Sequence, residues 1–117
     1  MKVLIIEDVP EMAELIRATL EGIPGVETRV VHTVLEGRRC ILKDRPDWIL
    51  LDEIVPGEDP YSLLSEPAIE GVRVFLITAA YQPEKPLPRG ALMRMAKWGW
   101  KDMLPVRARI AELLNRG

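Results

Sequence analysis

Continuous aliphatic runs alternate along this chain with segments in which apolar residues recur at helical spacing. A run without polar interruption, such as Val3–Ile6 or Trp48–Leu51, is typical of a strand buried on both faces of a sheet. On this pattern, strands are expected at residues 2–6, 27–31, 48–51, 72–77 and 100–104.

Apolar residues at helical spacing predict the helices between these strands. The first helix begins at Pro10 or Glu11, and Thr33 is the expected N-cap of a helix over residues 34–43. Further helices are expected at 61–66, around 90–98, and from Pro105 or Val106 onward. Strictly alternating strands and helices predict an α/β fold: a doubly wound, five-stranded parallel sheet with helices on both faces.

Composition is that of one folded domain, expected to span residues 1–117 with no output domain visible. Of the 117 residues, 48% are apolar and 29% are charged. No apolar stretch approaches the ~18 residues of a membrane-spanning helix, and no signal-peptide pattern opens the chain. The single cysteine, Cys40, excludes an internal disulfide and fits a reducing compartment. A cytoplasmic protein without a membrane partner is therefore expected.

Charge is distributed unevenly along the chain. Residues 1–88 carry 9 basic and 16 acidic side chains, whereas residues 89–117 carry 7 basic and 2 acidic ones. This basic C-terminal third is interpreted either as a solvated helical face or as a docking surface for an acidic partner or a second copy. The pI of about 5.5 argues against a nucleic-acid partner. The basic residues are Arg89, Arg94, Lys97, Lys101, Arg107, Arg109 and Arg116.

Three acidic residues follow the aliphatic runs directly. Glu7 and Asp8 come after the first predicted strand, and Asp52 comes after the third. Charges in these places lie at the carboxyl edge of a parallel sheet, where α/β proteins bind ligands. Three crowded carboxylates repel one another and need a cation. Hard oxygen ligands suit Mg²⁺, which keeps positions open for a phosphate, so phosphoryl chemistry is indicated.

In order and spacing, these motifs resemble the receiver domain of two-component response regulators over essentially the whole chain. The acidic pair Glu7-Asp8 closes the first strand, and the run 46–52 (PDWILLD) matches the approach to the family's phospho-accepting Asp. The segment 53–59 (EIVPGED) matches the loop that follows it. The segment 74–79 (VFLITA) resembles the fourth strand and its switch hydroxyl. The resemblance implies the flavodoxin-like (βα)5 receiver fold.

The resemblance also implies roles for individual residues. Asp52 would be the nucleophile that forms an aspartyl phosphate. Mg²⁺ would be held by Glu7, Asp8, Asp52 and the backbone carbonyl of Ile54. Thr78 would be the hydroxyl that binds a phosphoryl oxygen. Such a protein is no enzyme beyond catalysing its own phosphorylation and dephosphorylation. The implied partner is a sensor histidine kinase or a phosphotransfer protein.

One expected element of the family is displaced. Receivers carry a Lys directly before a Pro after strand five, and counting back from Pro105 places Leu104 there. Lys101 is the candidate substitute if the strand shifts in register. Without this cation the carboxylates keep their mutual repulsion. The aromatic switch residue of strand five is also replaced, by Met103 or Lys101 depending on the alignment.

Three functions therefore stay open. The first is a receiver phosphorylated on Asp52, and the second is a pseudo-receiver that binds partners without phosphorylation. The third is an aspartyl-phosphate enzyme of the haloacid-dehalogenase type, which usually needs a second Asp where this chain has Ile54. The retained Glu7, Asp8, Asp52 and Thr78 favour the first function. The missing Lys favours the second.

Overall fold

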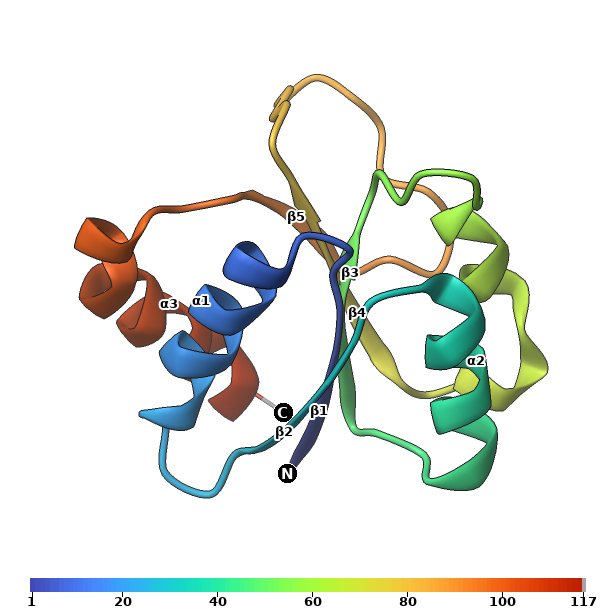
Figure 1. Cartoon of the computed structure of the whole chain (residues 1–117), viewed down its shortest axis with the longest axis horizontal. Coiled ribbons are helices and arrows are strands. Elements are labelled where there is room, and N and C mark those ends of the chain that lie inside the picture. Colours follow the sequence, from blue (N-terminus) through green and yellow to red (C-terminus); the bar gives the residue numbers. More distant parts are fainter. Residues whose placement is uncertain (117) are drawn as a thin grey trace.

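A single parallel sheet, with helices on both of its faces, organises the chain (Figure 1). This is a computed structural model, and it describes residues 1–116. The strand order is β2-β1-β3-β4-β5, and every neighbouring pair is parallel. The doubly wound five-stranded fold predicted from the sequence is therefore confirmed. The strands are β1 Lys2–Ile6, β2 Glu27–Val31, β3 Trp48–Asp52, β4 Arg73–Thr78 and β5 Met93–Ala96.

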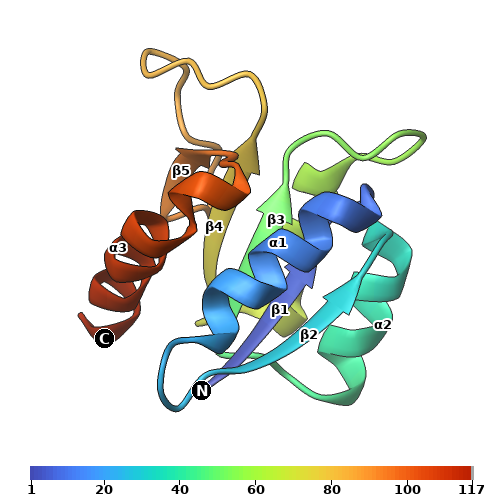
Figure 2. The same cartoon turned by 60° about the vertical axis from the view of Figure 1, so that its left-hand side comes forward.

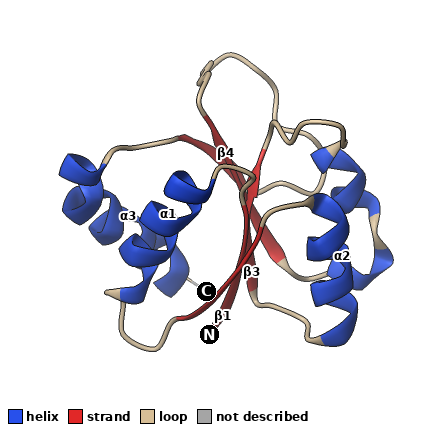
Figure 3. Cartoon of the chain, viewed as in Figure 1, coloured by secondary structure: helices blue, strands red, loops and turns tan. Residues whose placement is uncertain are grey.

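Helices lie on both sides of the sheet (Figure 3), and a hydrophobic layer holds them against each face. One layer lies under α1 (Pro10–Glu21) and α3 (Met103–Asn115). The other lies under α2 (Val34–Lys43) and two short 3₁₀ helices, η1 (Pro60–Ser65) and η2 (Pro67–Ile69). The central strand β3 is buried along its whole length, which explains its uninterrupted aliphatic run. Among residues 1–116, none of the helices combines the length and the apolar character that a membrane crossing requires.

The helix starts follow the local sequence signals. Pro10 occupies the first turn of α1, where its missing N–H costs nothing. The Thr33 hydroxyl accepts a hydrogen bond from the backbone N–H of Glu36 at 3.0 Å, so the predicted N-cap of α2 is confirmed. Asp59 caps η1 in the same way, through the N–H of Tyr61 at 3.0 Å.

The connection between β4 and β5 differs from the sequence prediction. The helix expected around residues 90–98 is absent, and residues 79–92 form an irregular loop that projects beyond the end of the sheet (Figure 2). The strand expected at 100–104 is also wrong, because these residues form η3 (Trp100–Asp102) and the first turn of α3. The fifth strand is Met93–Ala96, whose residues pair with Phe75–Thr78 of β4. Tertiary pairing outweighs the helical preference of Met, Ala and Arg here.

Arg107 of α3 closes the end of α1. Its Nε donates to the carbonyl of Thr19 at 2.8 Å, and its Nη2 donates to the carbonyl of Ala18 at 2.9 Å. These two carbonyls belong to the last turn of α1, where acceptors have no partner within the helix. A side chain at Gly22 would collide with the guanidinium, because its Cβ would lie 2.2 Å from Arg107 Cζ. Arg107 is therefore a structural residue of the α1–α3 contact rather than a free charge.

We expect Arg107→Met to lower the free energy of unfolding by about 1–3 kcal/mol, because the substitution leaves two carbonyls at the end of α1 without the charged donor that now binds them. Urea denaturation monitored by circular dichroism measures the loss. The matched control is Arg109→Met on the same helix, since Arg109 is exposed and makes no hydrogen bond or ion pair within residues 1–116. Equal stability of the two variants would contradict this role of Arg107.

Candidate functional site

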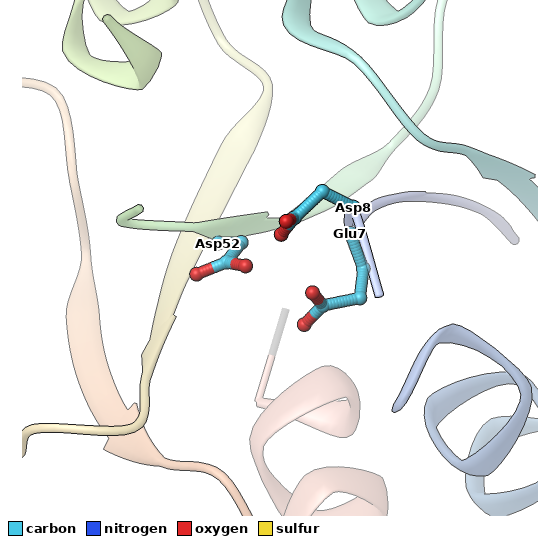
Figure 4. A group of neighbouring side chains, drawn as sticks. All are labelled: Glu7, Asp8 and Asp52. Carbon is cyan, nitrogen blue, oxygen red and sulfur yellow. The ribbon is translucent and has the colours of Figure 1, made fainter. Parts of the chain in front are cut away.

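The three acidic residues predicted from the sequence lie together at the carboxyl edge of the sheet (Figure 4). Glu7 and Asp8 follow β1, and Asp52 is the last residue of β3, which lies beside β1. One carboxylate oxygen from each residue lies within 4.8 Å of the other two. The strand order reverses between β1 and β3, and this switch point is where parallel α/β sheets bind ligands.

Lys97 supplies the positive charge of this site. Its Nζ lies 2.8 Å from Glu7 Oε1 and 3.0 Å from Asp52 Oδ2. Glu7 is fully buried and Asp52 is 2% exposed, so neither carboxylate is stabilised by bulk water. Buried charges need a partner of opposite sign, and one ammonium here serves two carboxylates. A bridge of this kind holds the ends of β1, β3 and β5 together.

The sequence prediction of this lysine was wrong. Leu104 lies on α3 and is 65% exposed, and Lys101 lies in η3 with an exposed side chain. Neither residue is among the ion-pair partners of the three carboxylates. Lys97 follows β5 directly, and its backbone N–H donates to the carbonyl of Thr78 at 2.9 Å. It was missed because Trp98, rather than a proline, comes after it. The available signal was a lysine directly after an apolar segment.

Glu7 and Asp52 divide the negative charge unequally. Burial raises the pKa of Glu7 to about 7, and the neighbouring Asp52 carboxylate adds to the effect, against the opposing bonds from Lys97 and the Val9 N–H. Burial acts in the same direction on Asp52, but hydrogen bonds from Glu7, the Ile54 N–H and Lys97 outweigh it and lower the pKa of Asp52. Asp52 is therefore the ionised member of the pair at neutral pH, as a nucleophile must be.

Thr78 and Ile54 border the acceptor from two neighbouring strands. Asp52 pairs in register with Ile77 of β4, so Thr78 ends the adjacent strand one residue further on. Thr78 is buried, with 5% of its surface exposed. Its hydroxyl accepts a hydrogen bond from the Ala80 N–H at 3.2 Å. The Ile54 N–H donates to Asp52 Oδ1 at 3.1 Å, while the Ile54 side chain is 62% exposed.

The donor set at this edge fits a hard divalent cation. Three carboxylates offer oxygens at close range, and Mg²⁺ prefers oxygen ligands. Glu7 Oε1 is buried and lies 2.8 Å from the Lys97 ammonium. A divalent cation bound by the three carboxylates could take over the charge compensation that this ammonium gives to Glu7.

A second buried ion pair lies beside the first, and it was not predicted from the sequence. Glu53, directly after Asp52, pairs with Arg94 of β5, and their side chains are 4% and 5% exposed. Tyr61 donates its hydroxyl hydrogen bond to the same carboxylate, and Lys85 lies 3.7 Å away. The prediction that Arg94 and Lys97 lie on an exposed basic face was therefore wrong.

Solved structures with the same fold were found, whereas no protein-family model and no curated protein sequence match the chain. The response regulator domain of Thermotoga maritima CheB has a TM-score of 0.81 at 17% identity, covering 99% of this chain and 94% of that one. The signal receiver domain of a signal transduction histidine kinase from Syntrophus aciditrophicus has a TM-score of 0.72 at 26% identity, covering 99% and 93%.

The chain has the receiver fold of response regulators. A third receiver of the same fold, the response regulator Rcp1, was solved in a form with Mn²⁺ bound; its TM-score is 0.75 at 18% identity, covering 97% of this chain and 93% of that one. The receiver fold predicted from the sequence is thereby confirmed. At these identities the comparisons establish the architecture, and the function has to be argued from the residues of the site itself.

We expect the metal-free protein to lose roughly 1–3 kcal/mol of unfolding free energy between pH 5 and pH 8, because Glu7 is easier to protonate in the folded chain. Its pKa is about 7 when folded against an ordinary value of 4.5, so the stabilisation is complete below 4.5 and is lost as pH rises through 7. Urea unfolding in a metal chelator measures this slope. Glu7→Gln cannot ionise and should flatten it, and an unchanged slope in that variant would contradict the assignment.

Proposed function

We propose that this chain is a receiver domain that accepts a phosphoryl group on Asp52 with the help of Mg²⁺. The observation that carries the proposal is the position of Lys97 between Glu7 and Asp52. It supplies the cation whose apparent absence was the main argument for a pseudo-receiver. An ionised, buried Asp52 beside Lys97 and close to Thr78 is a complete set of side chains for phosphoryl transfer to a carboxylate.

In the proposed reaction an oxygen of Asp52 forms a bond to phosphorus, and the bond from phosphorus to the donor's leaving atom breaks. The leaving group departs with the bonding electrons and takes a proton from water. Mg²⁺, when bound by Glu7, Asp8, Asp52 and the carbonyl of Ile54, would neutralise the phosphoryl oxygens. Lys97 would break its ion pairs with Glu7 and Asp52 and bind an oxygen of the transferred phosphoryl group. Thr78 would donate its hydroxyl hydrogen to a phosphoryl oxygen.

The phosphodonor partner is proposed to be a sensor histidine kinase or a phosphotransfer protein in the cytoplasm. Exposed apolar residues follow three of the strands at the carboxyl edge and suit docking of a protein surface. Val9 is 42% exposed, Ile54 62% and Trp100 56%, and each follows a different strand of the carboxyl edge. A partner that covers these residues would also exclude water from the phosphoryl group during transfer.

A phosphorylation-independent interaction module remains the second candidate. Two observations favour it: β5 (Met93–Ala96) contains no aromatic residue, and the connection before it contains no helix within the described chain. The basic C-terminal third gives this candidate less support than the sequence suggested, because Arg94, Lys97 and Arg107 make internal contacts. An acidic partner or a second copy would have to bind the remaining charges, Arg89, Lys101, Arg109 and Arg116.

Incubation with Mg²⁺ and a small-molecule phosphodonor should add one phosphoryl group to the wild-type chain, as read by intact mass. Asp52→Asn should abolish the adduct, because the amide is not a nucleophile. Lys97→Met should lower its yield at least about tenfold, since it removes a charge-assisted contact to the transferred group. A folded wild-type protein without an adduct would favour the interaction module instead.

The aspartyl phosphate should hydrolyse slowly, because the exposed neighbours of the site are apolar. Ile54 and Ala80 lie two residues beyond Asp52 and Thr78, and neither side chain can orient an attacking water. We expect Ile54→Asn to shorten the half-life of the adduct severalfold in Mg²⁺, whereas Ile54→Val should leave it unchanged. Timed mass spectra after removal of the donor give the rates. If the wild-type adduct hydrolyses as fast as the adduct of Ile54→Asn, this explanation is contradicted.

A further inference from the structure

The buried ion pair of Glu53 and Arg94 lies outside the three-carboxylate cluster but touches both loops beside it. Arg94 sits three residues before Lys97 on β5, and Glu53 directly follows Asp52. We propose that Arg94 is a positioning residue for the phosphoryl-acceptor site, because its one guanidinium fixes the two loops that flank Asp52. This inference rests on the proposed function and adds a residue to its machinery.

The first attachment of Arg94 is to the loop after β3. Its Nε donates to Glu53 Oε1, and its Nη2 donates to Oε2 at 3.3 Å, so the carboxylate is held at both oxygens. This contact and the Tyr61 hydroxyl outweigh the burial that opposes ionisation, and the pKa of Glu53 is lowered. Glu53 is therefore a charged anchor. Its backbone continues into Ile54, whose N–H holds Asp52 Oδ1 at 3.1 Å.

The second attachment is to the loop between β4 and β5. Arg94 Nη1 donates to the carbonyl of Lys85 at 2.9 Å, and Nη2 donates to that of Pro86 at 3.3 Å. Residues 79–92 contain no helix or strand within the described chain, so few backbone hydrogen bonds of their own hold them. The loop begins directly after Thr78, and its residue Ala80 donates to the Thr78 hydroxyl. A fixed loop therefore restrains the hydroxyl at the end of β4, the strand beside the one that carries Asp52.

The charge of Arg94 matters as much as its reach. Loss of the guanidinium would leave the buried Glu53 carboxylate with the Tyr61 hydroxyl and, as its one remaining cation within residues 1–116, the Lys85 ammonium at 3.7 Å. An unpaired buried carboxylate either takes up a proton or moves to water, and each response displaces the backbone that carries Ile54. A dianionic phosphoryl group would then form next to a disturbed loop. Misplacement of reacting groups by about 1 Å can cost as much as 100-fold in rate.

The test compares Arg94→Met, Arg94→Lys and Glu53→Gln with a matched control, Arg89→Met, which removes an exposed arginine within the same loop. Phosphorylation rates are measured by intact mass over a range of phosphodonor concentrations at saturating Mg²⁺. Hydrogen exchange of residues 53–58 and 79–92 is measured on the same variants without donor. The first readout reports positioning for the reaction, and the second reports attachment of each loop.

We expect Arg94→Met to lower the maximal phosphorylation rate about tenfold or more, with little change in the donor concentration for half-maximal rate, and to speed exchange in both loops. Glu53→Gln should speed exchange only at residues 53–58, because Arg94 still binds the carbonyls of Lys85 and Pro86. Arg94→Lys should keep the charge on Glu53 but free residues 79–92, since a single ammonium cannot reproduce the fork of a guanidinium. Arg89→Met should behave as wild type.

The outcomes separate this inference from the proposed function. An unmodified wild-type chain would overturn both. A wild-type adduct together with equally fast phosphorylation of Arg94→Met, or with unchanged exchange in its two loops, would overturn the role of Arg94 alone. If Arg94→Met does not fold, Arg94→Lys decides: wild-type rates and wild-type protection at residues 79–92 in that variant would reject the proposal.

Discussion

Compensation of buried negative charge at the carboxyl edge of the sheet is the constraint on which this structure depends. Glu7 and Asp52 are almost completely excluded from water, and an unpaired carboxylate in such a place costs several kcal/mol. Lys97 meets this requirement only because β5 pairs with β4 in a register that ends at Thr78 and Ala96. The register of an edge strand therefore decides whether a cation lies close enough to compensate the negative charge that Glu7 and Asp52 share.

β5 brings a second cation to the same edge. Arg94 of β5 compensates Glu53, and Lys97, directly after β5, compensates Asp52, so two consecutive acidic residues of the acceptor segment are each paired with a basic residue. Successive residues of a strand point to opposite faces, which is why the two ion pairs do not merge into one cluster. The site thus contains two ion pairs. The pair of Asp52 and Lys97 adjoins the carboxylates that could bind a cation, and the pair of Glu53 and Arg94 holds the two loops.

The central strands could be predicted from the sequence because burial on both faces leaves no room for polar side chains. Val3–Ile6 and Trp48–Leu51 each bury every residue, so the aliphatic run itself marks the element and its end. The acidic residues that follow these runs could therefore be assigned to one sheet edge. The same reasoning correctly predicted the fold class and brought Glu7, Asp8 and Asp52 together.

The fifth strand could not be recognised in this way. Its residues Met93-Arg94-Met95-Ala96 have helical preferences, and its strand conformation comes from pairing with Phe75–Thr78, which local sequence does not record. Lys97 could not be recognised either, because a lysine before Trp98 departs from the Lys-Pro pattern of receiver domains. The error therefore had one cause, the position of β5, and it affected every cation of the site.

Residues 79–92 form an irregular loop where the sequence predicts a helix, so different interactions must hold the backbone beside Asp52 in place. A helix satisfies its own backbone groups, whereas residues 79–92 rely on side-chain donors such as Arg94, which binds the carbonyls of Lys85 and Pro86. The same guanidinium is committed to Glu53, beside Asp52. Order in this loop is therefore tied to the charge balance of the acceptor segment, and electrostatics replaces apolar helix packing on this side of the site.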